Sequence, residues 1–164
     1  MQLHDDDFTL LGLPQQYALD INVLTAQWKA AMGAVHPDKF AQAGAQGQRL
    51  AVQWSVRMNE AYQRLKHPLK RAAYLCELRG AAIAAENNTS MPAAFLMQQM
   101  QWREDLDDAR SDAERGLVKT ALKAQAAQYQ HDLIQQLDVH NHPAAAAQTV
   151  RVWLFVDKFL SQIK

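Results

Sequence analysis

Three residues in direct succession, His36, Pro37 and Asp38, place an imidazole and a carboxylate on either side of a rigid proline. These two groups serve general acid–base catalysis, and they also bind metal ions or make charged contacts with other proteins. The two side chains are expected to point apart rather than into one site, which disfavours a catalytic pair. The triplet, with Lys39 beside it, is therefore a simple helix end, part of an active site or an exposed docking tip.

A second group of ligand-type residues, Asp138, His140 and His142, lies in the segment DVHNH. A His-x-His pair at a turn can bind zinc. No third ligand follows at a convincing spacing and no general base accompanies the pair, so a hydrolase or metalloenzyme is a weak alternative. Cys76 occupies an apolar position in AAYLCEL and is predicted to be a buried structural thiol. We therefore expect no catalytic residue, no metal and no cofactor.

The sequence around the triplet predicts two helices joined at a turn. Asp20 is a plausible N-cap for the first, whose apolar residues recur at helical spacing as Leu24, Trp28, Ala31 and Val35. Pro37 disfavours helical geometry at His36 and ends this helix. The segment AQAGAQGQ (41–48) predicts a loop. A second helix follows and ends before Pro68, with one face formed by Leu50, Trp54, Met58, Ala61 and Leu65. The matching stripes predict an antiparallel hairpin with the triplet at its turn.

The second half of the chain predicts a bundle of three helices. The segment AAIAAENNTS (81–90) loses the apolar stripe, so we place a junction at 77–91 between a first domain (1–76) and a second (92–164). Helical patterns cover roughly 92–110, 112–138 and 143–163. Ser111 and Glu114 form a capping-box pattern, and Pro143 stands in a first turn. The expected fold is all-α, a helical hairpin joined to a three-helix bundle.

Two faces of the first bundle helix differ in composition. At about 100° per residue, its core stripe is predicted to be Phe95, Trp102, Leu106, Ala109 and Ala113. The opposite face carries Met97, Met100, Glu104 and Asp108. Methionines beside carboxylates suit an adaptable binding surface, and burial by another helix is the alternative explanation.

The last helix contains an aromatic residue outside its apolar stripe. That stripe is Ala146, Val150, Trp153 and Leu160. Phe155 points away from it and requires a second neighbour or a partner.

Charge and composition exclude several partner classes. Seventeen basic and seventeen acidic residues cancel in this chain of 164 residues, so no overall field favours nucleic acid or an anionic membrane. The single cysteine excludes an intrachain disulfide and fits a reducing cytoplasm, where we expect the protein to be located. The start, MQLHDDDF, has acids where a signal peptide has bases, and no apolar run is long enough to cross a bilayer. A monomer is the default expectation.

The order of motifs in the first half resembles the J-domain of co-chaperones that act on DnaK-type chaperones. A helix is followed by HPDKF (36–40), a glycine-containing loop, a helix with NEAYQRL (59–65) and then HPLKRAAYL (67–75). The resemblance to one J-protein family, the HscB family of bacterial iron–sulfur cluster assembly, extends nearly end to end. It includes FTLLGLP (8–14), FLMQQMQWREDLDD (95–108) and VWLFVDKFL (152–160). The Gly/Phe-rich or Cys-rich region of a general J-protein is not present in this sequence.

This resemblance implies two binding surfaces. His36, Pro37 and Asp38, with the basic neighbours Lys39 and Lys29, would engage the DnaK-type chaperone HscA and trigger its ATP hydrolysis. Other basic residues near this tip are few, namely Arg49 and Arg57 on the following helix.

The implied surface for the iron–sulfur scaffold protein IscU lies in the bundle. It comprises Leu96, Met97, Met100, Glu104, Asp108 and Phe155. Gln101 stands where the family commonly has an acid. The alternative function is that of a broad-specificity J-protein that presents unfolded clients to its chaperone.

Overall fold

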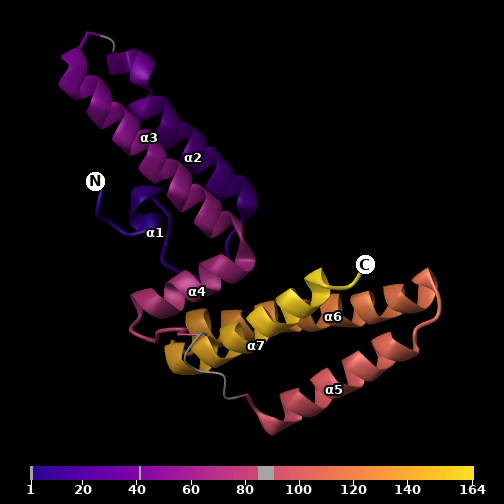
Figure 1. The fold of residues 1–164 in the computed structure, drawn as a ribbon. Coiled ribbons are helices and arrows are strands. Elements are labelled where there is room, and N and C mark those ends of the chain that lie inside the picture. The colour runs from indigo at the N-terminus through magenta and orange to yellow at the C-terminus, as the bar shows by residue number, and fades with distance from the viewer. Residues whose placement is uncertain (1, 41, 85–90) are drawn as a thin grey trace. The chain divides into compact units, whose positions relative to one another are not determined.

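The computed structural model describes residues 2–40, 42–84 and 91–164, and the described residues form helices and connecting turns without a strand. The prediction of an all-α protein is confirmed. The chain divides into two compact units, residues 1–75 and residues 76–164. The first contains a helical hairpin, and the second contains a helical bundle (Figure 1). No described helix combines the length and the apolar character needed to cross a membrane.

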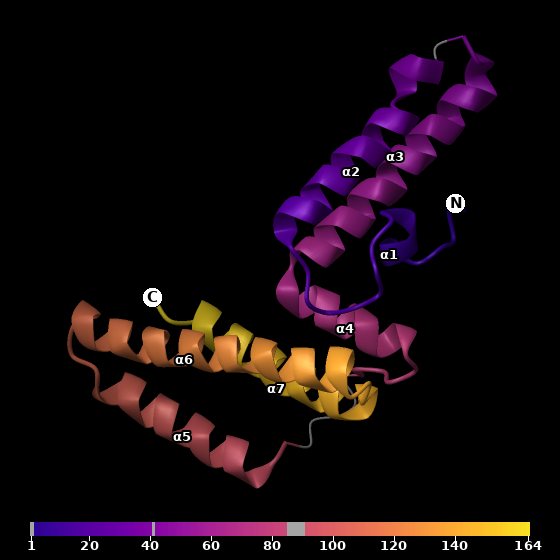
Figure 2. The same cartoon turned by 180° about the vertical axis from the view of Figure 1, so that it is seen from behind.

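The first unit contains the short helix α1 (Asp7–Leu10), the hairpin helices α2 (Ile21–Val35) and α3 (Gly44–Lys66), and most of α4 (Pro68–Leu78). The Asp20 carboxylate accepts a hydrogen bond from the Asn22 amide at 2.8 Å, which confirms the predicted N-cap of α2. Both views show α2 and α3 running antiparallel side by side (Figures 1 and 2). The predicted hairpin is therefore confirmed.

Apolar and aromatic contacts join the two hairpin helices. Leu24 of α2 and Met58 and Leu65 of α3 are fully buried. The Trp28 and Tyr62 rings stack with centroids 4.3 Å apart. Each large side chain buried in this way stabilises the fold by about 1.5–3 kcal/mol, so the apolar stripes are sufficient to fix the register of the hairpin.

The N-terminal half of α3 differs from its prediction in two ways. The helix already begins at Gly44, whose φ of +78° reverses the chain, so residues 44–48 are not a loop. Gly47 is in close contact with the preceding turn, because a Cβ there would lie 2.5 Å from Ala43 Cβ. Leu50 is 47% exposed rather than part of the core. At 100° per residue it lies roughly 75° from the centre of the buried face, at the edge of the stripe.

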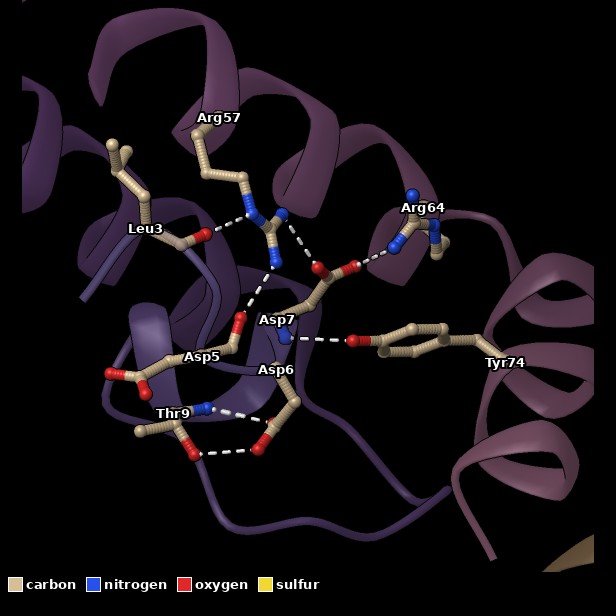
Figure 3. A network of polar contacts seen from close by, with 8 residues as sticks. All are labelled: Leu3, Asp5, Asp6, Asp7, Thr9, Arg57, Arg64 and Tyr74. Atoms are coloured by element: carbon tan, nitrogen blue, oxygen red, sulfur yellow. Dashed lines mark hydrogen bonds and ion pairs between the residues drawn. The ribbon is translucent and has the colours of Figure 1, made fainter. Parts of the chain in front are cut away.

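A buried ionic network fixes the N-terminal segment on α3 (Figure 3). The fully buried Asp7 carboxylate pairs with Arg57 at 2.8 Å and with Arg64 at 2.9 Å. Arg57 also donates to the carbonyl oxygens of Leu3 and Asp5. The Asp7 amide donates to the Tyr74 hydroxyl at 2.9 Å. Burial is the main reason that the pKa of Tyr74 is raised. The sequence predicted from these N-terminal acids only that no signal peptide is present. In the structure, Asp7 is the buried carboxylate that pairs with both arginines.

The second unit contains α5 (Ala93–Asp108), α6 (Asp112–Leu133), a π-helical turn η2 (Ile134–Val139) and α7 (Pro143–Ser161). Ser111 Oγ accepts from the Glu114 amide at 3.1 Å, which confirms the predicted cap of α6. Pro143 opens α7 as predicted. The largest fully buried side chains of this unit are Leu122, Leu133, Leu137, Val150 and Val156.

Three details of the bundle correct the predicted pattern. The core stripe does not continue past α5, because this helix ends at Asp108 and Ala113 is an exposed residue of α6. Leu106 and Ala109 are only half-buried. The helix predicted over 112–138 changes to π-helical geometry at Ile134.

The segment after α4 is held on the bundle by two arginines. Arg79 donates to the Leu137 carbonyl oxygen at 2.6 Å, which satisfies one of the acceptors left at a helix end. Arg151 donates to the carbonyl oxygens of Ala82 and Ile83. Residues 77–84 of the predicted junction 77–91 thus belong to the second unit. Residues 85–90 lie outside the described residues.

Candidate functional site

The His-Pro-Asp triplet lies at the turn of the hairpin, at the end remote from α1 and α4 (Figure 1). Helix α2 ends at Val35, and His36 has non-helical backbone angles (φ −59°, ψ 132°), as expected for a residue before proline. Pro37–Phe40 form the short 3₁₀ turn η1. The Lys39 amide donates to the His36 carbonyl oxygen at 3.0 Å. The backbone therefore fixes the orientation of the triplet.

His36 and Asp38 contact each other, so the prediction that their side chains point apart is wrong. The Asp38 amide donates to His36 Nδ1 at 3.2 Å, and the same nitrogen lies 3.5 Å from Asp38 Oδ2. The 3₁₀ turn folds residue 38 back toward residue 36, which the one-residue spacing alone did not indicate. The two side chains are 54% and 91% exposed. A pair this exposed is suited to contact with a second protein rather than to chemistry on a buried substrate.

The geometry also determines what the imidazole can offer a partner. When His36 Nδ1 accepts from the Asp38 amide, the neutral ring carries its proton on Nε2. His36 then presents an N–H donor and Asp38 presents carboxylate acceptors on the same exposed tip.

Of the basic residues expected near the tip, all but Arg57 are exposed. Lys29 on α2 and Lys39 in η1 are exposed, as is Arg49 on α3. Arg57 is engaged by the buried Asp7 and by two backbone carbonyls, so its charge belongs to the core network. The exposed positive charge near the tip is correspondingly small.

A line of exposed side chains along α5 forms the second candidate surface. Leu96, Met97 and Met100 are 46%, 72% and 70% exposed. Glu104 and Asp108 are also exposed and continue the same face of the helix. Exposed methionines are flexible, polarisable contacts that adapt to a partner. We call these five residues the α5 stripe.

Phe155 differs from the α5 stripe because the bundle itself supplies a neighbour for it. Its ring packs edge-on against Phe95, with centroids 5.9 Å apart, and the side chain is half-buried. Phe95 in turn contacts Trp102. The off-stripe position of Phe155 is therefore explained by packing between α5 and α7, and a partner contact for it stays a prediction.

A groove between α5 and α6 was missed by sequence reasoning. Its lining consists of Trp102, Asp105, Asp108, Ala109, Glu114, Leu117, Val118 and Ala121. Leu117 is 71% exposed although it lies among apolar neighbours. At 100° per residue Leu117 lies roughly 130° from the centre of the buried face formed by Val118, Leu122, Tyr129 and Leu133, so the helical pattern of α6 was the signal that could have marked it as exposed.

The hypothesis of a zinc site gains no support from the structure. His140 and His142 are exposed residues at the ends of η2 and α7. Within the described ranges, no three His, Cys, Asp or Glu side chains gather closely enough to hold a metal ion. Cys76 is buried as predicted, and burial raises its pKa to about 11.

Comparison with known proteins agrees with this arrangement. A family profile described as "HSCB C-terminal oligomerisation domain" matches residues 91–164. The chain is 46% identical to the "Co-chaperone protein HscB homolog" of Bordetella petrii, over 97% of this chain and 94% of the relative. The solved structure of the chaperone HscB from Vibrio cholerae is 35% identical and superimposes with a TM-score of 0.79, covering 97% of this chain and 95% of that one.

The human relative supports the fold alone. The crystal structure of human co-chaperone protein HscB superimposes with a TM-score of 0.89 at 23% identity, covering 99% of this chain and 82% of that one. The matches to the bacterial relatives extend over nearly the whole length of both chains. The chain belongs to the HscB family of co-chaperones.

Proposed function

We propose that this co-chaperone is an adaptor that binds an IscU-type iron–sulfur scaffold, delivers it to the DnaK-type chaperone HscA and stimulates ATP hydrolysis by HscA. The observation that carries the proposal is the presence of two exposed surfaces on two separate compact units, the His-Pro-Asp tip and the α5 stripe. The predicted first domain (1–76) binds the chaperone, the bundle (92–164) binds the scaffold, and residues 77–91 join them.

The tip acts on the chaperone by preferring one of its conformations. A ligand shifts a conformational equilibrium only by its difference in affinity for the two states. The exposed His36 and Asp38 offer a donor and acceptors in a fixed geometry, which is what such discrimination requires. The hydrolytic residues belong to HscA, so the protein proposed here is not itself an enzyme and uses no cofactor.

The α5 stripe holds the scaffold through a few apolar anchors beside carboxylates. Such small interfaces give affinities near micromolar, about −8 kcal/mol, because a handful of central side chains supplies most of the binding energy. This affinity permits the scaffold to be handed over. The remaining parts of the proposal are a monomeric state and a cytoplasmic location, without nucleic acid or membrane as partner.

Two variants separate the surfaces. His36→Gln removes the Nδ1 acceptor, and we expect it to abolish stimulation of HscA ATPase while scaffold binding is unchanged. The double change Met97→Ala and Met100→Ala is expected to do the reverse. We prefer Met100 to Phe155 in this test because Phe155 packs against Phe95 and its loss would disturb the bundle.

The measurement is the steady-state ATPase rate of HscA with and without IscU, together with calorimetric titration of IscU. Loss of both activities in both variants would contradict the two-surface proposal. Stimulation of a general DnaK without any response to IscU, together with binding of denatured proteins, would favour the broad-specificity J-protein instead.

A further inference from the structure

The α5 stripe does not end at the end of its helix. Asp108, its last member, also lines the groove between α5 and α6. Trp102 and Val118 are nearly buried in this groove, whereas Leu117 is one of the most exposed large apolar residues of the described chain. The proposed scaffold-binding surface is therefore continuous with an apolar recess on the second helix of the bundle.

The groove carries strong local negative charge. Residues 104–115 contain six acidic and two basic side chains, a net charge of −4. Of the nearby bases, Arg115 pairs with Asp112, Arg103 lies over the Phe159 ring on the α7 side, and Arg110 is exposed but does not line the groove. Asp105, Asp108 and Glu114 all line the groove. Its charge complements a segment that carries lysine or arginine.

Four of these carboxylates also stand where they are unfavourable for the helix itself. Residues 104–108 are the end of α5, whose last turn contains no basic residue, and helix C-termini disfavour negative charge. Residue types that are unfavourable for the secondary structure in which they lie tend to mark functional sites. The destabilisation of the α5 C-terminus by these carboxylates is an observation separate from the shape of the groove. It indicates that their negative charge serves binding rather than the stability of the helix.

We propose that the groove between α5 and α6 binds a segment of the scaffold protein in which an apolar side chain is flanked by lysine or arginine. The apolar side chain packs between Leu117 and Trp102, and the cations meet Asp105, Asp108 and Glu114. The inference rests on the proposed function, since it names a further part of the surface that binds the same partner. It extends that surface from α5 onto α6.

Calorimetric titration of an IscU-type scaffold into the full chain tests the apolar part. Leu117→Asn is expected to weaken binding by about tenfold, as for a central apolar contact. Val139→Asn is the matched control, because Val139 is also an exposed aliphatic residue (60%) of the second unit but does not line the groove. The control is expected to bind within about twofold of the wild type.

The charged part has its own matched pair. Asp105 lines the groove, whereas Asp157 is an exposed carboxylate of α7 that lies outside the groove and, at 100° per residue, roughly 160° from Phe155. We expect Asp105→Asn to weaken binding severalfold at low salt, and the difference from wild type to shrink at high salt. Asp157→Asn carries the same charge change and is expected to have little effect on binding.

Each outcome distinguishes the groove from the proposed function. If Leu117→Asn and Asp105→Asn bind like the wild type while the Met97 and Met100 double variant does not, the groove proposal is overturned and the adaptor function stands. If the wild type does not bind the scaffold, the adaptor function fails and the groove proposal fails with it. If Leu117→Asn instead converts a dimer of the wild type to a monomer in sedimentation velocity, the groove is covered by a second copy and the proposal is overturned.

Discussion

At the scale of single residues, Asp7 shows how a short acidic segment can determine the structure of a whole unit. Asp7 and Arg71 are the buried charged side chains among the described residues. The Asp7 carboxylate is shared between Arg57 and Arg64, so it joins the N-terminal segment to two successive turns of α3 (Figure 3). Removing the Asp7 charge leaves Arg57, whose side chain is 19% exposed, without its anionic partner, and breaking a buried pair in this way costs more than the pair contributes to stability.

Asp7→Asn is therefore expected to lower the free energy of unfolding of the first unit by roughly 3–5 kcal/mol. Hydrogen exchange of the amides of α1 and α3, followed by mass spectrometry, measures this unit separately from the bundle. Asp5→Asn is the control, because Arg57 contacts the carbonyl oxygen of Asp5 and not its carboxylate. A similar small loss in both variants would show that the buried charge is not the stabilising element.

Cys76 makes the stability of the second unit depend on pH, and the direction of this dependence follows from its pKa. Burial raises its pKa from 9.0 to about 11, so the folded state keeps the thiol proton to a higher pH than the unfolded state does. Its contribution to stability is complete below about pH 9 and is lost as the pH rises toward about 11. Burial also raises the pKa of Tyr129, to about 12, which adds a loss in the same direction at higher pH.

Cys76→Ala should accordingly reduce the slope of unfolding free energy against pH in the range of about 9 to 11. Urea unfolding at several pH values gives these slopes, and the comparison uses slopes because the alanine also leaves a small cavity. Equal slopes in variant and wild type would contradict the assignment of the alkaline loss to this thiol.

At the scale of helices, the adjoining ends of α5 and α6 place like charges in opposite dipole environments. Asp107 is in the last turn of α5, and Asp112 is in the first turn of α6. Asp107→Asn is expected to stabilise the bundle by a few tenths of a kcal/mol, and Asp112→Asn to destabilise it, since helix N-termini favour negative charge and C-termini disfavour it. Asp112→Asn also removes the ion pair with Arg115.

Hydrogen exchange of the amides in these two helices measures both effects, and added salt should reduce them. If the stability of the bundle changed in the same direction in both variants, net charge rather than position at the helix ends would determine the effect of these residues.

Most helix boundaries of this protein could be predicted because short-range residue chemistry sets them. Pro37, Asp20 and Ser111 act on their own neighbours, and each ends or caps a helix as predicted. The early start of α3 at Gly44 could not be predicted in this way, because a glycine in the left-handed region opens a helix here although glycine usually indicates a loop.

The exposed surfaces could be predicted only in part. Periodicity placed Met97, Met100, Glu104 and Asp108 opposite the core stripe with burial by another helix left open, and they are exposed, whereas Leu96 was named only from the resemblance to the family. The contact between His36 and Asp38 depends on the local 3₁₀ turn, and the ionic role of Asp7 depends on tertiary contacts with α3. Helical periodicity contains no information on these two features, whereas it would have placed Leu117 off the buried face of α6.

At the scale of the whole molecule, the covalent connection between the two units is the essential feature of the proposed adaptor. Each unit has its own core and its own candidate surface. A short tether gives two linked sites an effective concentration on the order of millimolar, well above a micromolar dissociation constant. Binding of the scaffold by the bundle thus brings it to whichever chaperone molecule the tip engages, without any new contact.

This reasoning predicts that the two surfaces cannot complement each other from separate chains. An equimolar mixture of His36→Gln with the Met97→Ala and Met100→Ala double variant contains one intact copy of each surface, but never both on one chain. We expect the mixture at micromolar concentration to show no scaffold-dependent increase in HscA ATPase beyond that of the double variant alone, whereas the wild type shows it fully. The control is a mixture of wild type with either variant, which should retain the increase. Recovery of the increase in the variant mixture would show that the tip and the bundle act as independent ligands of HscA and IscU, and that linkage in one chain is not what delivers the scaffold.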